Sequence, residues 1–433
     1  MYRGTSVSVN PPPARPAGGP AGHASVAERP PGWAAGTVSA IIGTCPAVIV
    51  DGRGGMKAVA VFPGTRETKI IERESPRLSE PDQVALRILD IGICGTDKEI
   101  CSFAYGTPPP GDAYLIIGHE SVAEVAEVGS AVSRLRVGDL VVPSVRRPCP
   151  HPECRACRSG HQDYCYTGDF SERGIKEAHG YMAEYVVDYE RYMNPVPPDL
   201  RDIAVLAEPL TIAEKAIAQV SWMMRQRPPW NGPGTPGEER GKGLSALVLG
   251  IGPVGLLGAM TLVTAGFTTY VYSRERPPSP RIDLVAAIGA TYVSSQTETF
   301  AGLAAQIGNI DLIYEAVGQS HFALEALRVL GTNGIFVLTG VPGLQAFIEA
   351  DPARLMRDMV LKNQVLLGTV NAGPEAFASA LRNLGAFRRR WPAAVQTLIA
   401  GRYPPEQASE LILGRPAGIK SVITFDGSPG SGA

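Results

Sequence analysis

The chain has 433 residues, of which 44% are apolar and 19% are charged, and its formal net charge at pH 7 is −2. This length allows two domains with separate cores, and the composition is that of an ordinary globular protein. The near-neutral charge and the lack of any Lys/Arg-rich run argue against nucleic acid or an anionic membrane surface as a partner. No apolar stretch approaches the ~20 residues needed to span a bilayer.

The first 55 residues differ in composition from the rest because they are rich in Pro, Gly and Ala. Such a segment buries little apolar surface, and we expect it to be disordered. The apolar run at 38–50 resembles a signal-peptide core, but the region before it is long, proline-rich and poor in concentrated positive charge. Residues 56–61 read as a native start that leads directly into a strand. We interpret residues 1–55 as a disordered leader or a misannotated extension.

Cysteine usage indicates a metal site. Seven cysteines are present, and four crowd into one short segment: Cys149, Cys154, Cys157 and Cys165. Four thiolates on one loop close a tetrahedral zinc site with no open position, which makes the site structural; free surface thiols are the alternative. The four-residue gap after Cys149 is looser than the two-residue gap before Cys157. A large enzyme with zinc-type cysteines fits a reducing compartment, so we expect the cytoplasm.

Short strands separated by Gly- and Pro-rich turns are expected at 57–62, 83–91 and 122–128. This pattern predicts a compact β-rich domain that follows the leader.

A second group of metal-ligating residues lies between these strands. Cys94 follows the second strand on a tight bend, and His119 and Glu120 precede the third. A thiolate, an imidazole and a carboxylate together hold zinc and leave a position open for substrate. Each residue alone has an ordinary alternative, such as a buried cysteine. Thr96 has two possible roles. It hydrogen-bonds a hydroxyl at the metal and passes the proton of that hydroxyl outward, or its own hydroxyl caps the turn.

Glu208 is the remaining carboxylate of interest. It precedes a helix expected over 210–223, whose start is marked by Pro209. The acid is either a favourable charge at the helix start or a fourth zinc ligand, directly or through water. The stretch at 225–243 is dominated by Arg, Pro, Gly and Glu, and we interpret it as a solvated linker.

A strand, a glycine-rich loop and a helix follow the linker in the order that a dinucleotide-binding fold needs. The strand is expected at 245–249 and the apolar helix runs through Val263. The glycines allow a tight turn and let the backbone approach the pyrophosphate at the helix N-terminus. The candidate cofactor residues of the loop are Gly250, Gly252, Pro253, Val254 and Gly255.

The end of the next strand, expected at 268–272, bears on cofactor choice. NAD-preferring folds usually place an acid there to bind the ribose hydroxyls. Here Ser273 is followed by Arg274 and Arg276 on either side of Glu275. The planar guanidinium suits a 2′-phosphate, so we predict NADP as the preferred cofactor with NAD tolerated. Glu275 keeps open the alternative of a solvated loop without a role in selectivity.

Further strands expected at 311–318 and 334–340 alternate with helices and predict a doubly wound parallel sheet in an α/β protein. The tail contains a helix at 375–388 and a final strand at 421–425, which could return to the first domain. The predicted domains are a leader (1–55), a β-rich zinc domain (56–243, completed by 371–433) and a Rossmann domain (244–370).

The zinc trio, the four-cysteine loop and the Rossmann loop, in that order, resemble the zinc-dependent medium-chain dehydrogenases, with a GroES-like catalytic domain. Within them, the likeness is to archaeal-type glucose 1-dehydrogenases and runs from Met56 to the end. The specific marks are residues 93–99 (ICGTDKE), 145–147 (VRR), 166–175 (YTGDFSERGI), 206–210 (LAEPL) and 368–371 (GTVN). The wide gap after Cys149 departs from the family's spacing, and Ala123 stands where many relatives have Gly.

The resemblance implies oxidation of an aldose such as D-glucose or galactose at C1 to the lactone, with hydride passed to NADP or NAD, by a homotetramer. It also implies roles for individual residues. Cys94, His119, Glu120 and Glu208 would surround a catalytic zinc, in addition to the structural zinc. Sugar contacts would come from Thr96, Glu120, Glu172, Glu208 and Asn371, and the adenosine ribose phosphate would face Ser273, Arg274 and Arg276.

Three other functions remain open at this stage. The nearest is a zinc-dependent alcohol or polyol dehydrogenase of the same superfamily, which Glu172 and Asn371 would distinguish from an aldose enzyme. A zinc-free NADPH-binding regulator or quinone reductase would lack the zinc ligands that this chain retains. A binding protein built only on the four-cysteine loop would leave the Gly118-His119-Glu120 motif and the glycine loop unexplained.

Overall fold

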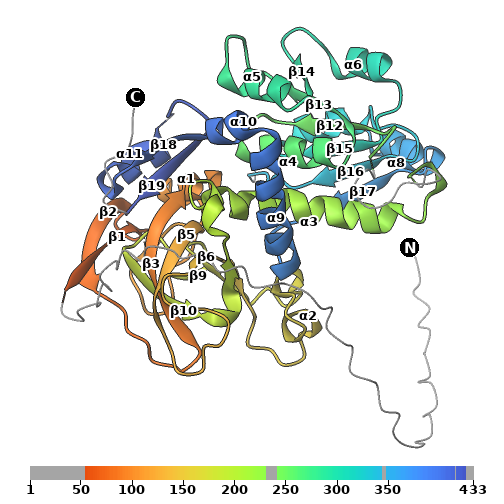
Figure 1. The fold of residues 1–433 in the computed structure, drawn as a ribbon. Helices are drawn as coiled ribbons and strands as arrows, with labels where there is room; N and C mark the ends of the chain where they lie inside the picture. The colour runs from red at the N-terminus through yellow and green to blue at the C-terminus, as the bar shows by residue number, and fades with distance from the viewer. Residues whose placement is uncertain (1–53, 231–240, 344–347, 415, 426–433) are drawn as a thin grey trace, which may run out of the picture. The chain divides into compact units, whose positions relative to one another are not determined.

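The structure is a computed structural model that describes residues 54–433 apart from 231–240, 344–347, 415 and 426–433. The expected leader therefore lies almost wholly outside the described residues, as does the middle of the expected linker. The described chain is a mixed α/β protein whose strands form two larger and two smaller sheets (Figure 1). None of its helices combines the length and the apolar character that crossing a membrane requires.

The strands of the first and last parts of the chain build three sheets. Their bounds are β1 Gly55–Phe62, β2 Glu67–Glu74, β3 Gln83–Gly92, β4 Leu115–Ile116, β5 Glu120–Val128, β6 Leu140–Pro143, β7 Arg146–Arg147, β8 Ser171–Arg173, β9 Glu177–Ala178, β10 Tyr185–Tyr189, β11 Met193–Pro195, β18 Ile399–Tyr403 and β19 Lys420–Thr424. The largest sheet has the order β11-β6-β5-β3-β19-β18, and β10 also pairs with β3. The small sheets are β2-β1-β4 and β7-β8-β9.

The last strand of the chain lies next to β3. β19 runs antiparallel to β3, with Val422 opposite Gly92 and Ile423 opposite Ile91, and in Figure 1 the blue strand lies beside the orange one. Because β3 also pairs with β5 on its other side, residues from three distant parts of the sequence meet at the end of β3. This pairing places Lys420 beside the candidate zinc residues.

The second large sheet is parallel throughout, in the order β14-β13-β12-β15-β16-β17. Its strands are β12 Ser245–Leu249, β13 Thr268–Ser273, β14 Thr291–Ser294, β15 Leu312–Glu315, β16 Ile335–Leu338 and β17 Val365–Gly368. Both faces are covered: Ala246 and Val248 of β12 belong to one apolar core, and Leu247 and Leu249 belong to another. Burial on both faces is what a doubly wound sheet requires, so the predicted fold class is confirmed.

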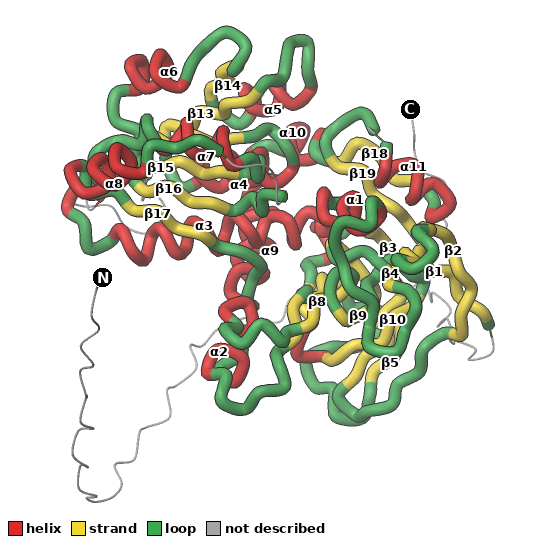
Figure 2. Tube along the Cα trace, turned by 180° about the vertical axis from the view of Figure 1, so that it is seen from behind, coloured by secondary structure: helices red, strands yellow, loops and turns green. Residues whose placement is uncertain are grey.

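The helices are α1 Gly95–Cys101, α2 Arg155–Arg158, α3 Ala207–Met224, α4 Pro253–Thr264, α5 Pro280–Ala287, α6 Phe300–Ile307, α7 Ser320–Leu327, α8 Pro352–Leu361, α9 Pro374–Arg390, α10 Pro392–Thr397 and α11 Ala408–Leu413. In Figure 2, strands β15 to β17 lie between α7 and α3. The 3-10 turn η1 (Gln162–Tyr164) lies in the four-cysteine segment.

Two helix starts differ from the sequence expectation. The chain after Cys94 forms the short helix α1 rather than a bare turn, and Thr96 lies in its first turn. Helix α3 begins at Ala207, three residues before the expected start, so that Pro209 lies inside its first turn. A proline is tolerated there because the first N–H groups of a helix have no partner within the helix. Glu208 is therefore part of the helix rather than a residue before it.

Candidate active site

The structure brings Cys94, His119 and Glu120 together. Cys94 directly precedes α1, and Glu120 opens β5 opposite Gly92 of β3. One ligand atom from each of the three lies within 4.8 Å of the others. The imidazole and the carboxylate are buried, while the thiol is partly exposed. Sulfur, nitrogen and oxygen donors in this arrangement fit a zinc ion with one position open toward a ligand.

Gly92 makes room for the Glu120 carboxylate. A Cβ atom at this position would lie 2.3 Å from Glu120 Oε2. Any side chain would therefore displace the carboxylate, and only glycine allows it to lie against β3.

Lys420 and Asp97 complete the surroundings of the trio. Lys420 Nζ lies 2.5 Å from Glu120 Oε2 and donates to the Ile93 carbonyl at 3.1 Å. Asp97 Oδ2 accepts from the Cys94 backbone N–H at 2.8 Å, and its Oδ1 lies 3.6 Å from His119 Nδ1. A carboxylate beside a metal-binding imidazole is common around zinc. Neither residue is predicted from the sequence, although a lysine that opens a buried strand is a usable signal.

Glu208 faces the trio from α3 but is not a member of the 4.8 Å cluster. Burial raises the pKa of its carboxyl to about 7; the Glu120 carboxylate acts in the same direction, while His119 and Lys420 oppose it. The charged groups at the trio therefore influence the pKa of Glu208, as expected of a residue beside the same site. Thr96 Oγ1 lies 3.8 Å from Cys94 Sγ.

The four cysteines of the second site also converge. The Sγ atoms of Cys149, Cys154, Cys157 and Cys165 all lie within 4.8 Å of one another, so the wide gap does not keep Cys149 away. Cys154 Sγ and Cys165 Sγ are 3.9 Å apart, and all four are free. Disulfide sulfurs lie ~2.0 Å apart, whereas thiolates held tetrahedrally ~2.3 Å from zinc are about 3.8 Å apart. The spacing fits a structural zinc.

The glycine loop lies at the switch point of the parallel sheet, between β12 and α4. Gly250 has φ +106°, a conformation that L side chains rarely adopt. Gly252 precedes α4, whose first residues are Pro253 and Val254, and Gly255 follows in the first turn. The open N-terminus of α4 is therefore available to a pyrophosphate at the carboxyl ends of the strands.

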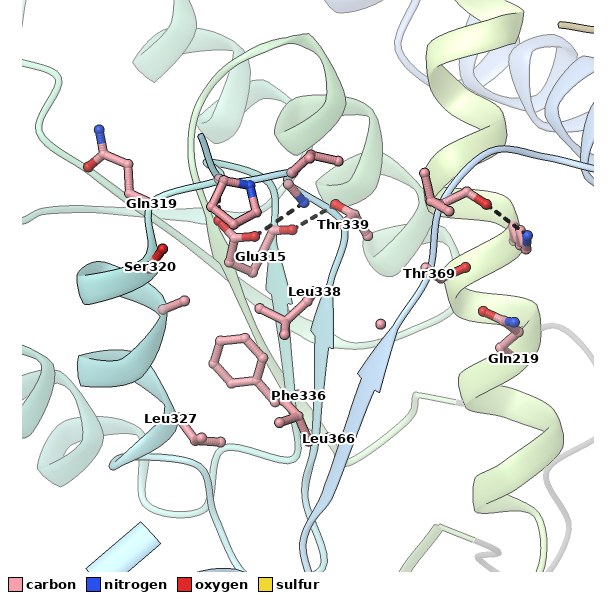
Figure 3. Close-up of a pocket in the computed structure, with 18 of the residues that line it drawn as sticks. Gln219, Glu315, Gln319, Ser320, Leu327, Phe336, Leu338, Thr339, Leu366 and Thr369 are labelled. Carbon is pink, nitrogen blue, oxygen red and sulfur yellow. Dashed lines mark hydrogen bonds between the residues drawn. The ribbon is translucent and has the colours of Figure 1, made fainter. Parts of the chain in front are cut away.

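A cavity of about 620 Å³ lies at the carboxyl ends of β15, β16 and β17. Figure 3 shows Glu315, Leu338 and Thr339 at these strand ends and Phe336 and Leu366 further down the strands. Glu315 Oε1 accepts from the backbone N–H groups of Val317 and Gly318, both at 2.7 Å. The zinc trio does not line this cavity. Its position at the sheet's carboxyl edge fits the nicotinamide half of a dinucleotide.

At the end of β13, the Glu275 carboxylate contacts other partners than Arg274 and Arg276. Glu275 Oε1 accepts from Ser279 Oγ at 2.8 Å, and Arg281 lies 4.0 Å from the other carboxylate oxygen. Arg276 donates to Gln296 at 3.0 Å. Arg274 is exposed, and in the described part of the chain it has no hydrogen bond or ion pair. One guanidinium at the strand end is thus free for an anion.

Glu172 and Asn371 meet although 199 residues separate them. Asn371 Nδ2 donates to Glu172 Oε1 at 2.8 Å. Glu172 is buried on β8, and Asn371 follows β17 with φ +57°. The two residues that the resemblance assigns to sugar hydroxyls therefore form one polar unit.

Comparisons with known proteins agree with this geometry. Residues 80–198 match the alcohol dehydrogenase GroES-like domain, and residues 201–425 match the glucose dehydrogenase C-terminus. Glucose 1-dehydrogenase of Methanocella arvoryzae is 36% identical over 369 residues, which are 85% of this chain and 99% of the relative. The chain belongs to the glucose 1-dehydrogenase family of zinc-dependent medium-chain dehydrogenases. Another family member, glucose 1-dehydrogenase 2 of Vulcanisaeta moutnovskia, is 38% identical, with 79% and 92% of the two chains covered.

A solved structure of the family supports the same assignment. The chain is similar to Haloferax mediterranei glucose dehydrogenase in complex with NADP, Zn and gluconolactone, with 32% identity and a TM-score of 0.74. The match covers 86% of this chain and 99% of the Haloferax chain. The family prediction made from the sequence is confirmed.

Proposed function

We propose that this protein is a zinc- and NADP-dependent glucose 1-dehydrogenase that oxidises D-glucose, or a related aldose such as galactose, at C1 to the lactone. The observation that carries the proposal is the hydrogen bond between Asn371 and Glu172, in a chain of the glucose 1-dehydrogenase family that also assembles an open Cys-His-Glu trio. A dehydrogenase for simple alcohols has no need of a paired carboxylate and amide for sugar hydroxyls.

The residues divide the chemistry among them. Cys94, His119 and Glu120, with Glu208 directly or through water, would hold a zinc ion, which supplies Lewis-acid polarisation of the C1 hydroxyl when bound. The Thr96 hydroxyl takes up the C1 hydroxyl proton and passes it outward. NADP, held at the glycine loop by Gly250, Gly252 and Gly255, would accept the hydride from C1 when bound, and the sugar would leave as the lactone.

Sugar selectivity comes from fixed hydrogen-bond partners. Glu172 accepts from one sugar hydroxyl, and Asn371 orients the carboxylate while offering its own amide. The wrong epimer leaves the buried Glu172 carboxylate and the Asn371 amide without their partners, which costs far more than a small change of shape. Aldoses that share the matching hydroxyl geometry are accepted together.

Cofactor preference follows from the end of β13. The exposed Arg274, with Ser273 and Arg276 beside it, binds the 2′-phosphate of NADP. Glu275, which would take the ribose hydroxyls of NAD, is held by Ser279 and Arg281. NAD is therefore accepted, but with weaker binding.

The active form is a homotetramer in the cytoplasm. The exposed apolar side chains of α8 and β17 support self-association: Met356, Val360, Leu361 and Leu366. Light scattering of the purified protein coupled to size exclusion checks the oligomer.

The deciding experiment is NADP reduction by purified protein with glucose, galactose, xylose and ethanol, before and after chelation. We expect turnover of glucose that is lost on chelation and returns with zinc. E172Q and N371A should raise the KM for aldoses by about tenfold or more, with measurable turnover left, and should keep NADPH binding, measured by fluorescence titration. Turnover of ethanol or a polyol without any aldose would keep the zinc chemistry and contradict the aldose assignment.

A further inference from the structure

A closed ring of mostly buried polar groups includes the Glu172–Asn371 pair, and its other members have no role in the function described so far. Each member contacts the next through a hydrogen bond, an ion pair or a peptide link. In order, the ring runs through Glu172, Arg146, Asp163, Lys215, Val370 and Asn371. Its four charged residues are each at most 7% exposed. Buried charges persist only when they are paired, and two cations here face two anions.

Arg146 controls one oxygen of Glu172. The two residues lie opposite each other in the β7–β8 pair. Arg146 Nε and a terminal nitrogen both contact Glu172 Oε1, at 3.1 and 3.0 Å, and Asn371 donates to the same oxygen. Within the described residues, Glu172 Oε2 accepts no hydrogen bond. The carboxylate is thereby fixed with one oxygen occupied and the other free for a ligand hydroxyl.

The other side of the guanidinium reaches the four-cysteine loop. Arg146 donates to the Asp163 carbonyl at 3.3 Å, and Gln162 Nε2 donates back to the Arg146 carbonyl at 3.3 Å. Both contacts lie in η1, between Cys157 and Cys165. The centroid of the Phe170 ring lies 3.7 Å from the guanidinium carbon, and the ring limits the movement of the guanidinium.

Lys215 of α3 closes the ring. Its Nζ lies 2.8 Å from Asp163 Oδ2 and donates to the Val370 carbonyl at 2.9 Å. Val370 directly precedes Asn371. By holding the Val370 carbonyl, the lysine also fixes the position of the Asn371 side-chain amide that contacts Glu172. Asp163, Lys215 and Val370 line the cavity at the sheet edge as well.

We propose that Arg146 is a positioning residue for aldose binding. It holds Glu172 so that Oε2 faces the sugar, and through Asp163 it makes sugar affinity depend on the folded four-cysteine loop. The inference rests on the proposed function and adds a residue and a coupling that the aldose assignment does not itself require.

The test compares Arg146 with its neighbour on the same strand. Arg147 is partly buried, and it pairs with Asp188 and Tyr181 rather than with Glu172. R146K keeps the charge but loses the planar fork, and we expect its KM for glucose to rise about tenfold or more. Its kcat and its NADPH affinity should stay within about threefold. R147K should lower the melting temperature and leave the glucose KM unchanged.

A double-mutant cycle separates positioning from general weakening. If Arg146 acts through Glu172, R146K should change the glucose KM far less in an E172Q background than in the wild type. Additive effects would overturn the inference, as would an unchanged KM in R146K. If R146K fails to fold, F170L loosens the same guanidinium at a half-buried position and should raise the glucose KM roughly twofold to fivefold; an unchanged KM there overturns the inference too. In all these cases, turnover of glucose by the wild type would leave the proposed function standing. If the wild type turned over no aldose, both the proposed function and the inference about Arg146 would be wrong.

Discussion

The two metal-ligating clusters use cysteine in opposite ways. The trio at the end of β3 combines three donor types on rigid strand ends and leaves its thiol partly exposed. The second cluster gathers four thiols from one loop segment, and two of them are fully buried or nearly so. The trio leaves one metal position open toward a ligand, whereas the four thiols of the loop cluster fill all four positions of a tetrahedral zinc site. An open cluster should therefore govern activity, and a closed one should govern stability.

The buried Asp188 is the centre of another polar cluster, which, like the Arg146 ring, closes without a metal. Asp188 Oδ2 accepts from Tyr181 at 2.7 Å and lies 2.5 and 3.1 Å from the guanidinium groups of Arg147 and Arg173. It lies in the same β-rich part of the chain as the four-cysteine loop. Substitutions in the Asp188 cluster therefore test why the two kinds of cluster differ. If the cause is that all polar groups are paired within the protein, and not that the ligands are cysteines, these substitutions should affect stability rather than activity.

The largest effect should come from opening the trio. C94S removes a thiolate donor from a partly exposed position, so we expect kcat for glucose to fall by about a thousandfold or more, because several kcal/mol of transition-state stabilisation depend on the metal. The melting temperature should change little. Zinc content and steady-state kinetics check this, and a variant that keeps half of its activity would contradict the open-site interpretation.

Breaking the closed cluster should instead cost stability. C154S introduces a hydroxyl at a fully buried cysteine, and we expect the free energy of unfolding to fall by on the order of 4 kcal/mol. The folded fraction should keep its kcat, while the glucose KM rises because Asp163 of the same loop holds Arg146. Urea unfolding and kinetics on the same preparation measure both. A loss of kcat equal to that of C94S would remove the distinction between the clusters.

The trio and the glycine loop were predictable because each is a local pattern of residues next to a strand end. Lys420 was not, since it reaches Glu120 across 300 residues through the pairing of β19 with β3. The Arg146 ring depends in the same way on contacts between three distant segments. Helix α1 was missed because seven residues are too few to show a helical period. Local chemistry is readable from sequence, whereas the groups that orient it come from sheet pairing.

The metal-free closed cluster should show a pH signature rather than a loss of activity. Burial alone would raise the pKa of Asp188, but Arg147 and Arg173 hold it at about 2. An unfolded aspartate has a pKa of about 3.9, so the folded state binds fewer protons between these values. The contribution is therefore complete above about pH 5 and is lost as the pH falls toward 2, by about 2 to 3 kcal/mol.

D188N removes this titrating group, and its unfolding free energy should fall less steeply than that of the wild type between pH 5 and pH 3. Denaturant titrations at pH 5, 4 and 3 give the two slopes. Equal slopes would mean that Asp188 does not titrate in this range. Its glucose KM at neutral pH is the control and should match that of the wild type.

The smallest effect concerns an open group on the surface. Arg274 is exposed and unpaired within the described residues, so R274Q should not change the melting temperature. It should raise the KM for NADP about tenfold, the value of one charge-assisted phosphate contact, and leave the KM for NAD unchanged. R281Q is the matched control because it removes a nearby arginine that faces Glu275 instead of the solvent. Equal changes for both cofactors would mean that Arg274 supports the loop rather than reading the 2′-phosphate. A rise in the KM for NADP alone would extend the comparison from the buried clusters to the surface. Groups that have no partner within the protein would then determine what the protein binds.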